Sequence, residues 1–400
     1  MKSIRYLFRI GNGPSSSHTI APLNAIRFII GENPDVKKMD VTLRGSLAFT
    51  GRGHFTDIAI TDELESHHIE NGISFDYDTE TEYPNEMEVV VDNSKKYRVI
   101  SLGGGALKIN DHLIDDEKEI YPEKNFSEIK AFCLSHNISL PEYVYLREGV
   151  EIKDYLKTVY ETMMNTVGRG LESGGVLPGK LHLQRKAKIF FEKDDENESN
   201  QSRMTRLVTS YAYACGEENA SGGTVVTAPT CGSCGVLPAV LRYFSDFNDM
   251  SLDNCIDALA VAGVIGNVIK HNGSISGAEA GCQAEIGTAT AMSAAAVSFL
   301  RGLNINGIES ASEMAIEHSL GLTCDPVLGY VQIPCIERNA VAALEAIQIS
   351  YISDFVMNSH LVSLDDIIQT ALMTGKDLKS NYRETSSGGL ATITKFNAGE

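Results

Sequence analysis

Beyond about residue 150 the chain is dominated by apolar, alanine-rich segments. Apolar positions recur there at intervals of three and four residues, which predicts a series of helices. Many small residues let helix backbones approach closely, so we expect a tightly packed bundle with buried irregular loops between the helices. The segments with this pattern are 152–165, 202–215, 235–244, 252–270, 281–300, 308–320, 339–357 and 364–372.

The amino-terminal part of the chain has a different pattern. Short β-like runs, broken by glycine and asparagine, occur at 41–43, 87–92 and 97–102. The interval 115–151 is rich in Glu, Lys and Pro, which predicts a connector with one short helix near 126–135. Four hundred residues exceed the usual size of one hydrophobic core. We therefore predict an α+β protein, in which a smaller amino-terminal α/β domain precedes a larger all-α domain.

Charge and hydropathy exclude several classes of protein. The formal charge of −19 is spread through both halves, so no nucleic-acid partner is expected. The longest apolar runs, 258–266 and 288–300, are shorter than the roughly 20 residues that span a bilayer, so no membrane partner is expected. Arg5 and Arg9 interrupt the apolar amino terminus, which argues against an export signal. Eight cysteines in such a chain favour free thiols or metal ligands in the cytoplasm.

A cluster of hydroxyl residues around His18 precedes the first apolar-periodic segment, at 20–30. Helix amino termini attract anions through their unpaired backbone N–H groups. A substrate carboxylate could therefore bind there, with His18 near the reacting carbon. An ordinary helix cap explains the same pattern, and taken alone the segment favours the cap. The hydroxyl residues are Ser15, Ser16, Ser17 and Thr19.

His54 follows a β-like run that breaks at Gly51 and Gly53. A loop of this kind can present a side chain to a cleft. Imidazole titrates close to neutral pH, so a desolvated His54 could act as a general base. A loop histidine is more often simply exposed, and that alternative stays open here.

Three cysteines, Cys282, Cys324 and Cys335, lie in unusual local sequence. Glycines flank the first, and prolines lie next to the other two or nearly so, which predicts thiols in irregular loops. Any one cysteine is more often a small buried hydrophobe, but three in such segments favour an iron-sulfur cluster. Three ligands on a four-iron cluster would leave one iron open as a Lewis acid.

The remaining cysteines carry weaker signals. Cys231 and Cys234 form a C-x-x-C motif, whose spacing is compatible with zinc, a cluster or redox chemistry, and so they compete for the metal. Cys133, Cys215 and Cys255 lie in helix-like sequence without a ligand pattern and are interpreted as structural.

Taken together, these segments resemble the bacterial iron-sulfur L-serine dehydratase family over nearly the whole chain. The resemblance implies a beta-type domain at 1–145 fused to an all-helical alpha-type catalytic domain at 150–400, and a homodimer. The matching motifs are GPSSSHT at 13–19, GSLAFTGRGHFTD at 45–57, GGG at 103–105, ENASGGTVVTAPT at 218–230, GCQAEIG at 281–287, LGLTCDPV at 320–327 and VQIPCIERN at 331–339.

The resemblance also implies a 4Fe-4S cluster on Cys282, Cys324 and Cys335, and the conversion of L-serine to pyruvate and ammonia. His54 then resembles the base that removes the Cα proton, and His18 a second histidine that assists proton transfer. The serines at 15–17 and Thr19 resemble a substrate-contacting loop. Family members commonly have other residues in place of the C-x-x-C motif, which leaves a fourth cluster ligand open.

Three alternatives compete with this activity. A pyridoxal-phosphate dehydratase would catalyse the same reaction, but no Schiff-base lysine segment with a glycine-rich phosphate loop is evident. L-cysteine desulfhydration by the same cluster is a rival within the lyases, because sulfur binds iron well. A non-catalytic iron-sulfur sensor would leave His18 and His54 without a role.

Overall fold

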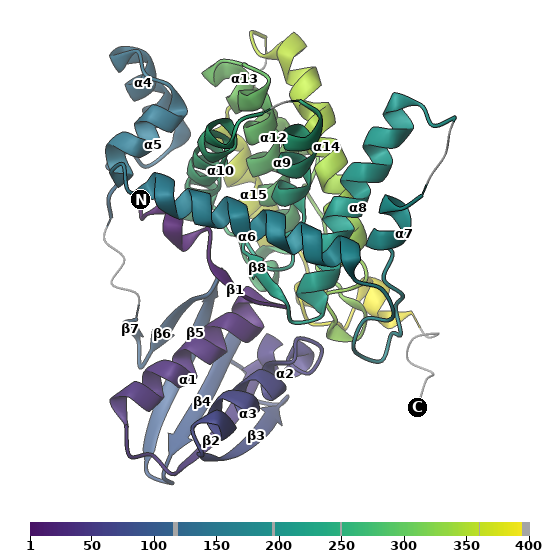
Figure 1. The fold of residues 1–400 in the computed structure, drawn as a ribbon. Coiled ribbons are helices and arrows are strands. Elements are labelled where there is room, and N and C mark those ends of the chain that lie inside the picture. The colour runs from purple at the N-terminus through teal and green to yellow at the C-terminus, as the bar shows by residue number, and fades with distance from the viewer. Residues whose placement is uncertain (115–118, 194–196, 249, 360, 394–400) are drawn as a thin grey trace.

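The computed structural model describes residues 1–114, 119–193, 197–248, 250–359 and 361–393. A six-stranded sheet with helices on one face forms the smaller part of the molecule, and a large helical body forms the rest (Figure 1). The predicted α+β class is therefore confirmed.

The sheet has the strand order β3-β2-β4-β5-β6-β7. Only β2 and β3 are parallel, and each of the other neighbouring pairs is antiparallel. Its apolar face packs against α1 (Ala21–Glu32) and α3 (Thr56–Ser66) to form a separate small core (Figure 1). The strands are β2 (Lys38–Gly45), β3 (Glu70–Asp76), β4 (Asn85–Val91), β5 (Lys95–Gly103), β6 (Ala106–Ile109) and β7 (His112–Leu113).

The predicted runs at 41–43, 87–92 and 97–102 lie in β2, β4 and β5, except that β4 ends one residue earlier, at Val91. Strand β3 was not predicted. It lies at the edge of the sheet, and all its residues are exposed or only partly buried, so its sequence lacks the apolar run of a central strand.

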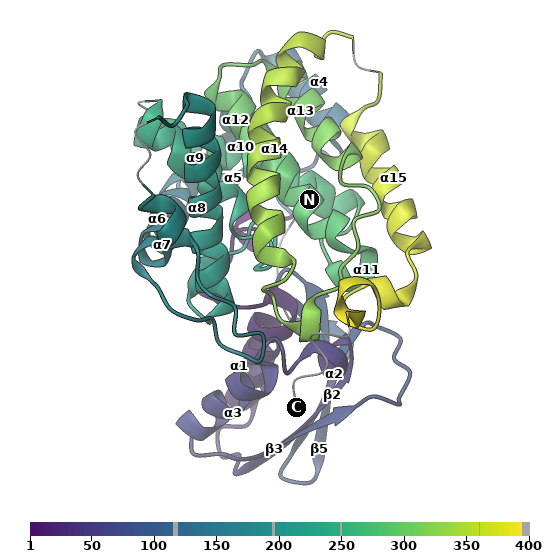
Figure 2. The same cartoon turned by 90° about the vertical axis from the view of Figure 1, so that its right-hand side faces the viewer.

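Each of the eight predicted helical segments overlaps a helix of the large helical body (Figure 2). The connector helix predicted near 126–135 is confirmed as α4. The helices are α4 (Phe126–His136), α5 (Leu140–Glu148), α6 (Ile152–Glu172), α7 (Ala187–Phe191), α8 (Asn200–Ala220), α9 (Val236–Phe247), α10 (Leu252–Asn272), α11 (Gly277–Ala280), α12 (Thr288–Leu300), α13 (Ile305–Glu317), α14 (Cys335–Val356) and α15 (Leu364–Asp377).

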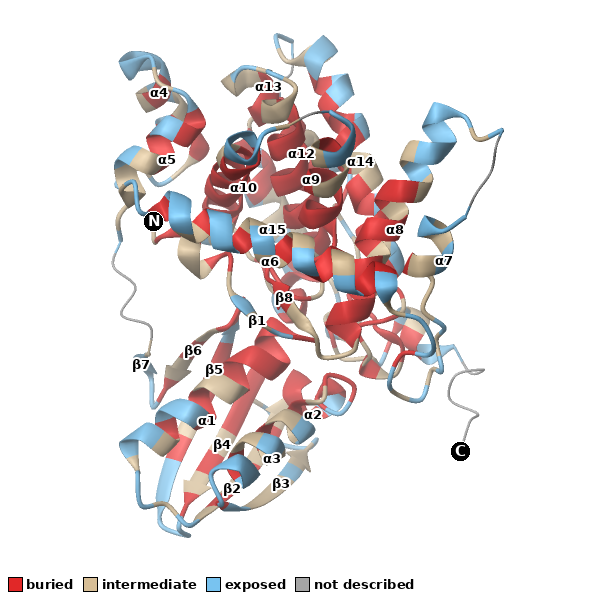
Figure 3. Ribbon diagram, in the orientation of Figure 1, coloured by how far each residue is buried: buried red, intermediate tan, exposed pale blue. Residues whose placement is uncertain are grey.

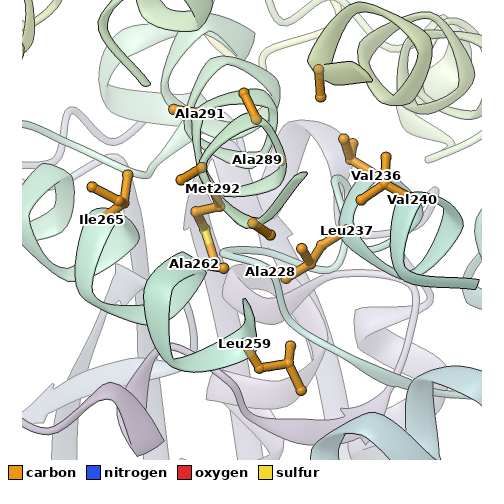
Figure 4. Packing of buried hydrophobic residues seen from close by; sticks show 14 of the residues in the cluster. Ala228, Val236, Leu237, Val240, Leu259, Ala262, Ile265, Ala289, Ala291 and Met292 are labelled. Atoms are coloured by element: carbon orange, nitrogen blue, oxygen red, sulfur yellow. The ribbon is translucent and has the colours of Figure 1, made fainter. Parts of the chain in front are cut away.

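Helices α9, α10 and α12 form the centre of the body and are buried along most of their length (Figure 3). Their contact is built from small and branched residues, among them Ala262, Ala289 and Val240, and Met292 packs between α10 and α12 (Figure 4). Small side chains on facing helices let the backbones pack closely, as the alanine-rich segments predicted.

One helix, α10, is long and apolar enough to cross a membrane. The run at 258–266, which lies inside it, is by itself shorter than the roughly 20 residues that span a bilayer. Of the most apolar window of α10, 78% is buried inside the protein, as expected for the core helix of a globular domain. Its apolar character is therefore explained by packing against α12.

The two larger hydrophobic cores among the described residues divide the chain in a way that sequence position does not suggest. Residues at the amino terminus, Met1 to Phe8, and the helices α4 and α5 belong to the core of the helical body. Strand β1 (Ile10–Asn12) pairs antiparallel with β8 (Thr224–Val226) of that body. The division at 1–145 and 150–400 stays a prediction, and α4 and α5 contribute to the larger core rather than to the sheet.

The loop between α2 (Ser46–Thr50) and α3 meets the loop after Pro326 where the two parts of the molecule touch. A Cβ atom on Gly53 would lie 2.4 Å from the carbonyl carbon of Gly329, so only glycine fits there. Gly329 itself has φ of +74°, a conformation that favours glycine. This contact brings the GRGH segment beside the cysteine-bearing loops.

Candidate active site

His18 lies in a short π-helix, η2 (Ser16–Ile20), that leads into α1. The Ser15 hydroxyl caps this helix by accepting a hydrogen bond from the His18 backbone N–H at 3.1 Å. The Ser17 hydroxyl lies 2.8 Å from His18 Nδ1, and Ser15 and Ser17 are themselves linked at 3.3 Å. The predicted helix cap is thus present, and its hydroxyls orient the imidazole.

His54 lies in the turn between α2 and α3 and is fully buried, contrary to the alternative that it is simply exposed. The residue after it, Phe55, has a left-handed backbone, which starts α3 in a new direction. His54 Nδ1 donates to the Thr50 carbonyl at 2.9 Å. The ring is therefore held by the last turn of α2.

Two threonines hold the histidine segments together. The Thr19 hydroxyl donates to the His54 carbonyl at 2.9 Å, and the Thr56 hydroxyl donates to the His18 carbonyl at 2.6 Å. The two imidazole centroids are 4.3 Å apart with 34° between the ring planes. The structure therefore brings together the two histidines that the sequence singled out separately.

Hydrogen-bond partners assign the protons on both rings. A carbonyl only accepts, so His54 carries its proton on Nδ1, and Nε2 holds a free lone pair. Ser46 Oγ donates to the Glu384 carbonyl at 2.6 Å, so it accepts from His18 Nε2 at 3.1 Å. His18 Nδ1 is then an acceptor for Ser17. A neutral imidazole with a free nitrogen is the form a general base requires.

Burial keeps both imidazoles neutral at neutral pH. Desolvation lowers the pKa of His54 to about 4, against 6.5 for an exposed histidine. Burial and the neighbouring His54 lower the pKa of His18 well below its usual value.

The lowered pKa of His54 makes stability depend on pH. Between about pH 6.5 and 4 the unfolded chain binds more protons at this residue than the folded one, so stability falls as pH falls. We expect the wild type to lose about 3 kcal/mol more than His54→Gln between about pH 7 and pH 4. Urea unfolding of the two proteins at both pH values measures the difference. Equal losses would contradict a neutral buried His54.

A carboxylate that the sequence did not single out, Glu384, faces both histidines. Its Oε1 lies 3.6 Å from His18 Nδ1 and 3.9 Å from His54 Nε2, and only 6% of the residue is exposed. Burial, with the charges of Glu285 and Cys282, raises the pKa of this carboxyl. His18, His54 and Glu384 together could also hold a metal ion by distance alone.

Three thiols lie beside this group. Cys282 follows Gly281, whose φ is +75°, at the start of the short π-helix η3 (Gln283–Gly287). Cys324 lies in extended chain that pairs with Arg383. Cys335 was predicted to lie in an irregular loop but is the first residue of α14, because a proline directly before a helix is compatible with its start.

A second carboxylate, that of the half-buried Glu285, lies among the thiols. Ligand atoms of Cys282, Glu285 and Cys324 all lie within 4.8 Å of one another. Cys335 is close enough that the charge of Cys282 acts on it, while burial raises its pKa. The Arg338 guanidinium hydrogen-bonds to Cys282 and donates to the Thr323 carbonyl. The donor set is therefore three thiols with one adjacent cation.

The other cysteines are all buried. Cys234 contacts the Cys215 carbonyl at 3.9 Å inside the core of the helical body. Burial raises the pKa of Cys231, and Glu285 is among the charges that act on it, so the C-x-x-C loop lies beside the thiol group. Cys133 and Cys255 lie in α4 and α10, away from these loops.

Sequence reasoning missed Glu384, Ser46 and Glu285. Glu384 lies in a polar loop near the carboxyl terminus with φ of +56° and has no periodic or motif signal around it. Glu384 and its partner Ser46 are 338 positions apart in the sequence, and only the fold brings them together. The serines at 15 and 17 have protein partners in the structure, so their contact with substrate stays a prediction.

Three thiols beside two neutral imidazoles, where a small sheet meets an all-helical body, form the candidate active site of an α+β enzyme, and thiolates are common ligands of zinc and of iron-sulfur clusters.

Comparison with known proteins agrees with this description. The family model described as serine dehydratase beta chain matches residues 3–139, and the one described as serine dehydratase alpha chain matches residues 77–391. L-serine dehydratase 1 of Escherichia coli (strain K12) is 37% identical, with 98% of this chain and 99% of that protein covered. The L-serine dehydratase of Helicobacter pylori (strain ATCC 700392 / 26695) is 38% identical with the same coverage. This chain belongs to the serine dehydratase family and carries the beta-chain and alpha-chain regions in one polypeptide.

Proposed function

We propose that this protein is an L-serine ammonia-lyase that converts L-serine to pyruvate and ammonia. One observation carries the proposal: the free Nε2 of His54 lies 3.9 Å from the carboxylate of Glu384, which is itself close to the thiol of Cys282. An elimination from serine needs a base for a weakly acidic Cα proton and an electrophile for a poor hydroxide leaving group. The site offers residues for both.

The thiols fit a 4Fe-4S cluster held by Cys282, Cys324 and Cys335. They come from three separate segments, and Arg338 lies beside them to offset negative charge. Cys282 and Cys324 are each 4% exposed, and Cys335 is half-buried. When bound, the cluster supplies a Lewis-acidic iron for the carboxylate and β-hydroxyl of the amino acid.

The protein's own residues supply the proton chemistry. His54 Nε2 takes the Cα proton, and its Nδ1–H, fixed on the Thr50 carbonyl, keeps the lone pair aimed at the substrate. His18 Nδ1 accepts from Ser17, which is linked to Ser15, so these side chains form a hydrogen-bonded chain beside His54 along which a proton can be passed. The aminoacrylate product tautomerises to an imine, and water hydrolyses it to pyruvate and ammonia.

A cavity lies next to this site, at the junction of the two parts. It has a volume of about 1130 Å³ and is lined by Thr19 and Phe55, which adjoin His18 and His54, and by Gly11 and Gly222. The two histidines and Glu384 are almost fully buried, which supports an amino acid rather than a macromolecule as the substrate.

The proposal extends to compartment and assembly. All eight cysteines are free thiols in the structure, which supports a reducing cytoplasm. The homodimer implied by the family resemblance is proposed with it, and sedimentation of the anaerobic protein measures that state.

Substrate choice tests the proposed activity. With the cluster reconstituted under anaerobic conditions, we expect pyruvate from L-serine with kcat/KM at least about tenfold above that from L-cysteine, and slower deamination of L-threonine to its 2-oxoacid. Coupled assays with lactate dehydrogenase measure each 2-oxoacid. Faster turnover of L-cysteine would make the protein a desulfhydrase, and loaded protein that deaminates none of the three would favour a sensor.

A further inference from the structure

The Glu384 carboxylate is buried without a fixed cation. In the described part of the chain, the only groups within ion-pair distance of it are His18 and His54. The proton assignments above place a lone pair, not an N–H, on the nitrogen that each ring turns toward Oε1. Neither neutral imidazole can therefore donate a hydrogen bond to this carboxylate.

Among the described residues, no side chain donates a hydrogen bond to the Glu384 carboxylate. The Ser46 hydroxyl donates to the backbone carbonyl of Glu384, not to its side chain. Arg338 bonds to the Thr323 carbonyl and Asp325, and Arg383 donates to the Glu279 carbonyl. One backbone N–H, that of Ala278, bonds to the Glu384 carboxylate. A buried anion with so few partners is costly unless a ligand completes it.

We propose that the Glu384 carboxylate binds the α-ammonium group of the amino acid substrate. This inference rests on the proposed function. It gives a partner to the ammonium, the one charged group of serine to which the proposed function assigns none. A Lewis-acidic metal takes anionic and lone-pair donors, such as a carboxylate and a hydroxyl, but repels an ammonium. Glu384 is the carboxylate nearest to the base, whereas Glu285 lies among the thiols.

The position of Glu384 also matches the reaction. Its Oε1 and His54 Nε2 are 3.9 Å apart, so an ammonium bound to one places the adjoining Cα–H beside the other. The ammonium has three N–H donors, and the two carboxylate oxygens of Glu384 can accept from them. Glu384 thereby selects α-amino acids over the corresponding hydroxy acids and positions the proton that is removed.

Two unreactive ligands separate this role from others. L-Alanine has the ammonium but no hydroxyl, and 3-hydroxypropionate has the hydroxyl and carboxylate but no ammonium. Their dissociation constants are measured by anaerobic calorimetry on the cluster-loaded wild type and E384Q, which keeps the size of the side chain. We expect E384Q to raise the dissociation constant of L-alanine by about 10- to 100-fold, and that of 3-hydroxypropionate by less than about twofold.

Further variants supply the controls. E384D keeps the charge and should recover part of the L-alanine affinity, which also guards against a folding defect in E384Q. Glu279 is exposed and hydrogen-bonds to Ser274 outside the site, so E279Q should match the wild type. With L-serine, E384Q should raise KM by more than it lowers kcat.

Two results would overturn the assignment. Equal weakening of both ligands would mean that Glu384 only supports the structure, and unchanged L-alanine affinity with a lower kcat would mean that it handles protons. The proposed function fails separately, if loaded wild type forms no pyruvate from L-serine. The affinity comparison does not depend on that turnover.

Discussion

Replacing His54 with alanine is expected to lower kcat for pyruvate formation by about a thousandfold and leave the iron and sulfide content unchanged. A positioned general base contributes about 10²- to 10⁴-fold to such a step. His54 is the stronger candidate because its Nε2 has no protein donor among the described residues, whereas His18 Nδ1 already accepts from Ser17. The visible spectrum and iron count report the cluster, and anaerobic assays report turnover.

The control for this experiment is an exposed histidine of the same domain. His67 ends α3 on the surface beside Glu63, so His67→Ala should turn over at the wild-type rate. If His54→Ala kept more than about a tenth of wild-type kcat, the base would have to be sought at His18. His18→Ala would then show the larger loss.

Replacing Cys335 with alanine is expected to remove both the cluster and the activity. Only three cysteines are predicted to hold the cluster, and this substitution would leave two. Iron and sulfide should therefore fall below about a tenth of the wild-type content. Because Cys335 is the first residue of α14 and alanine favours helix, α14 itself should still form. Iron and sulfide analysis of anaerobically purified protein measures the loss.

A cysteine in the core distinguishes ligand loss from general damage. Cys133 is buried in α4 and has no neighbour among the three thiols, so Cys133→Ala should keep the full cluster at a modest cost in stability. A Cys335→Ala protein with normal iron content would mean that another residue is the third ligand. Cys231, beside Glu285, would be the first to test.

Local sequence was sufficient for most of the architecture. The helices of the body and the central strands β2, β4 and β5 were predicted because their periodicity is written in residues a few positions apart. Strand β3 escaped because an edge strand with one weakly buried face has no comparable pattern. The role of α4 and α5 in the larger core escaped as well, since packing partners are not a local property.

The chemistry divides in the same way. From the sequence alone came the two histidines, the three thiols and the family, because each lies in a short segment of unusual composition. Only the tertiary structure showed that His54 is buried, which ring nitrogens carry the protons, and that Glu384 faces both rings. Desolvation and hydrogen bonding depend on what surrounds a side chain, and here those surroundings come from segments more than 300 positions apart in the chain.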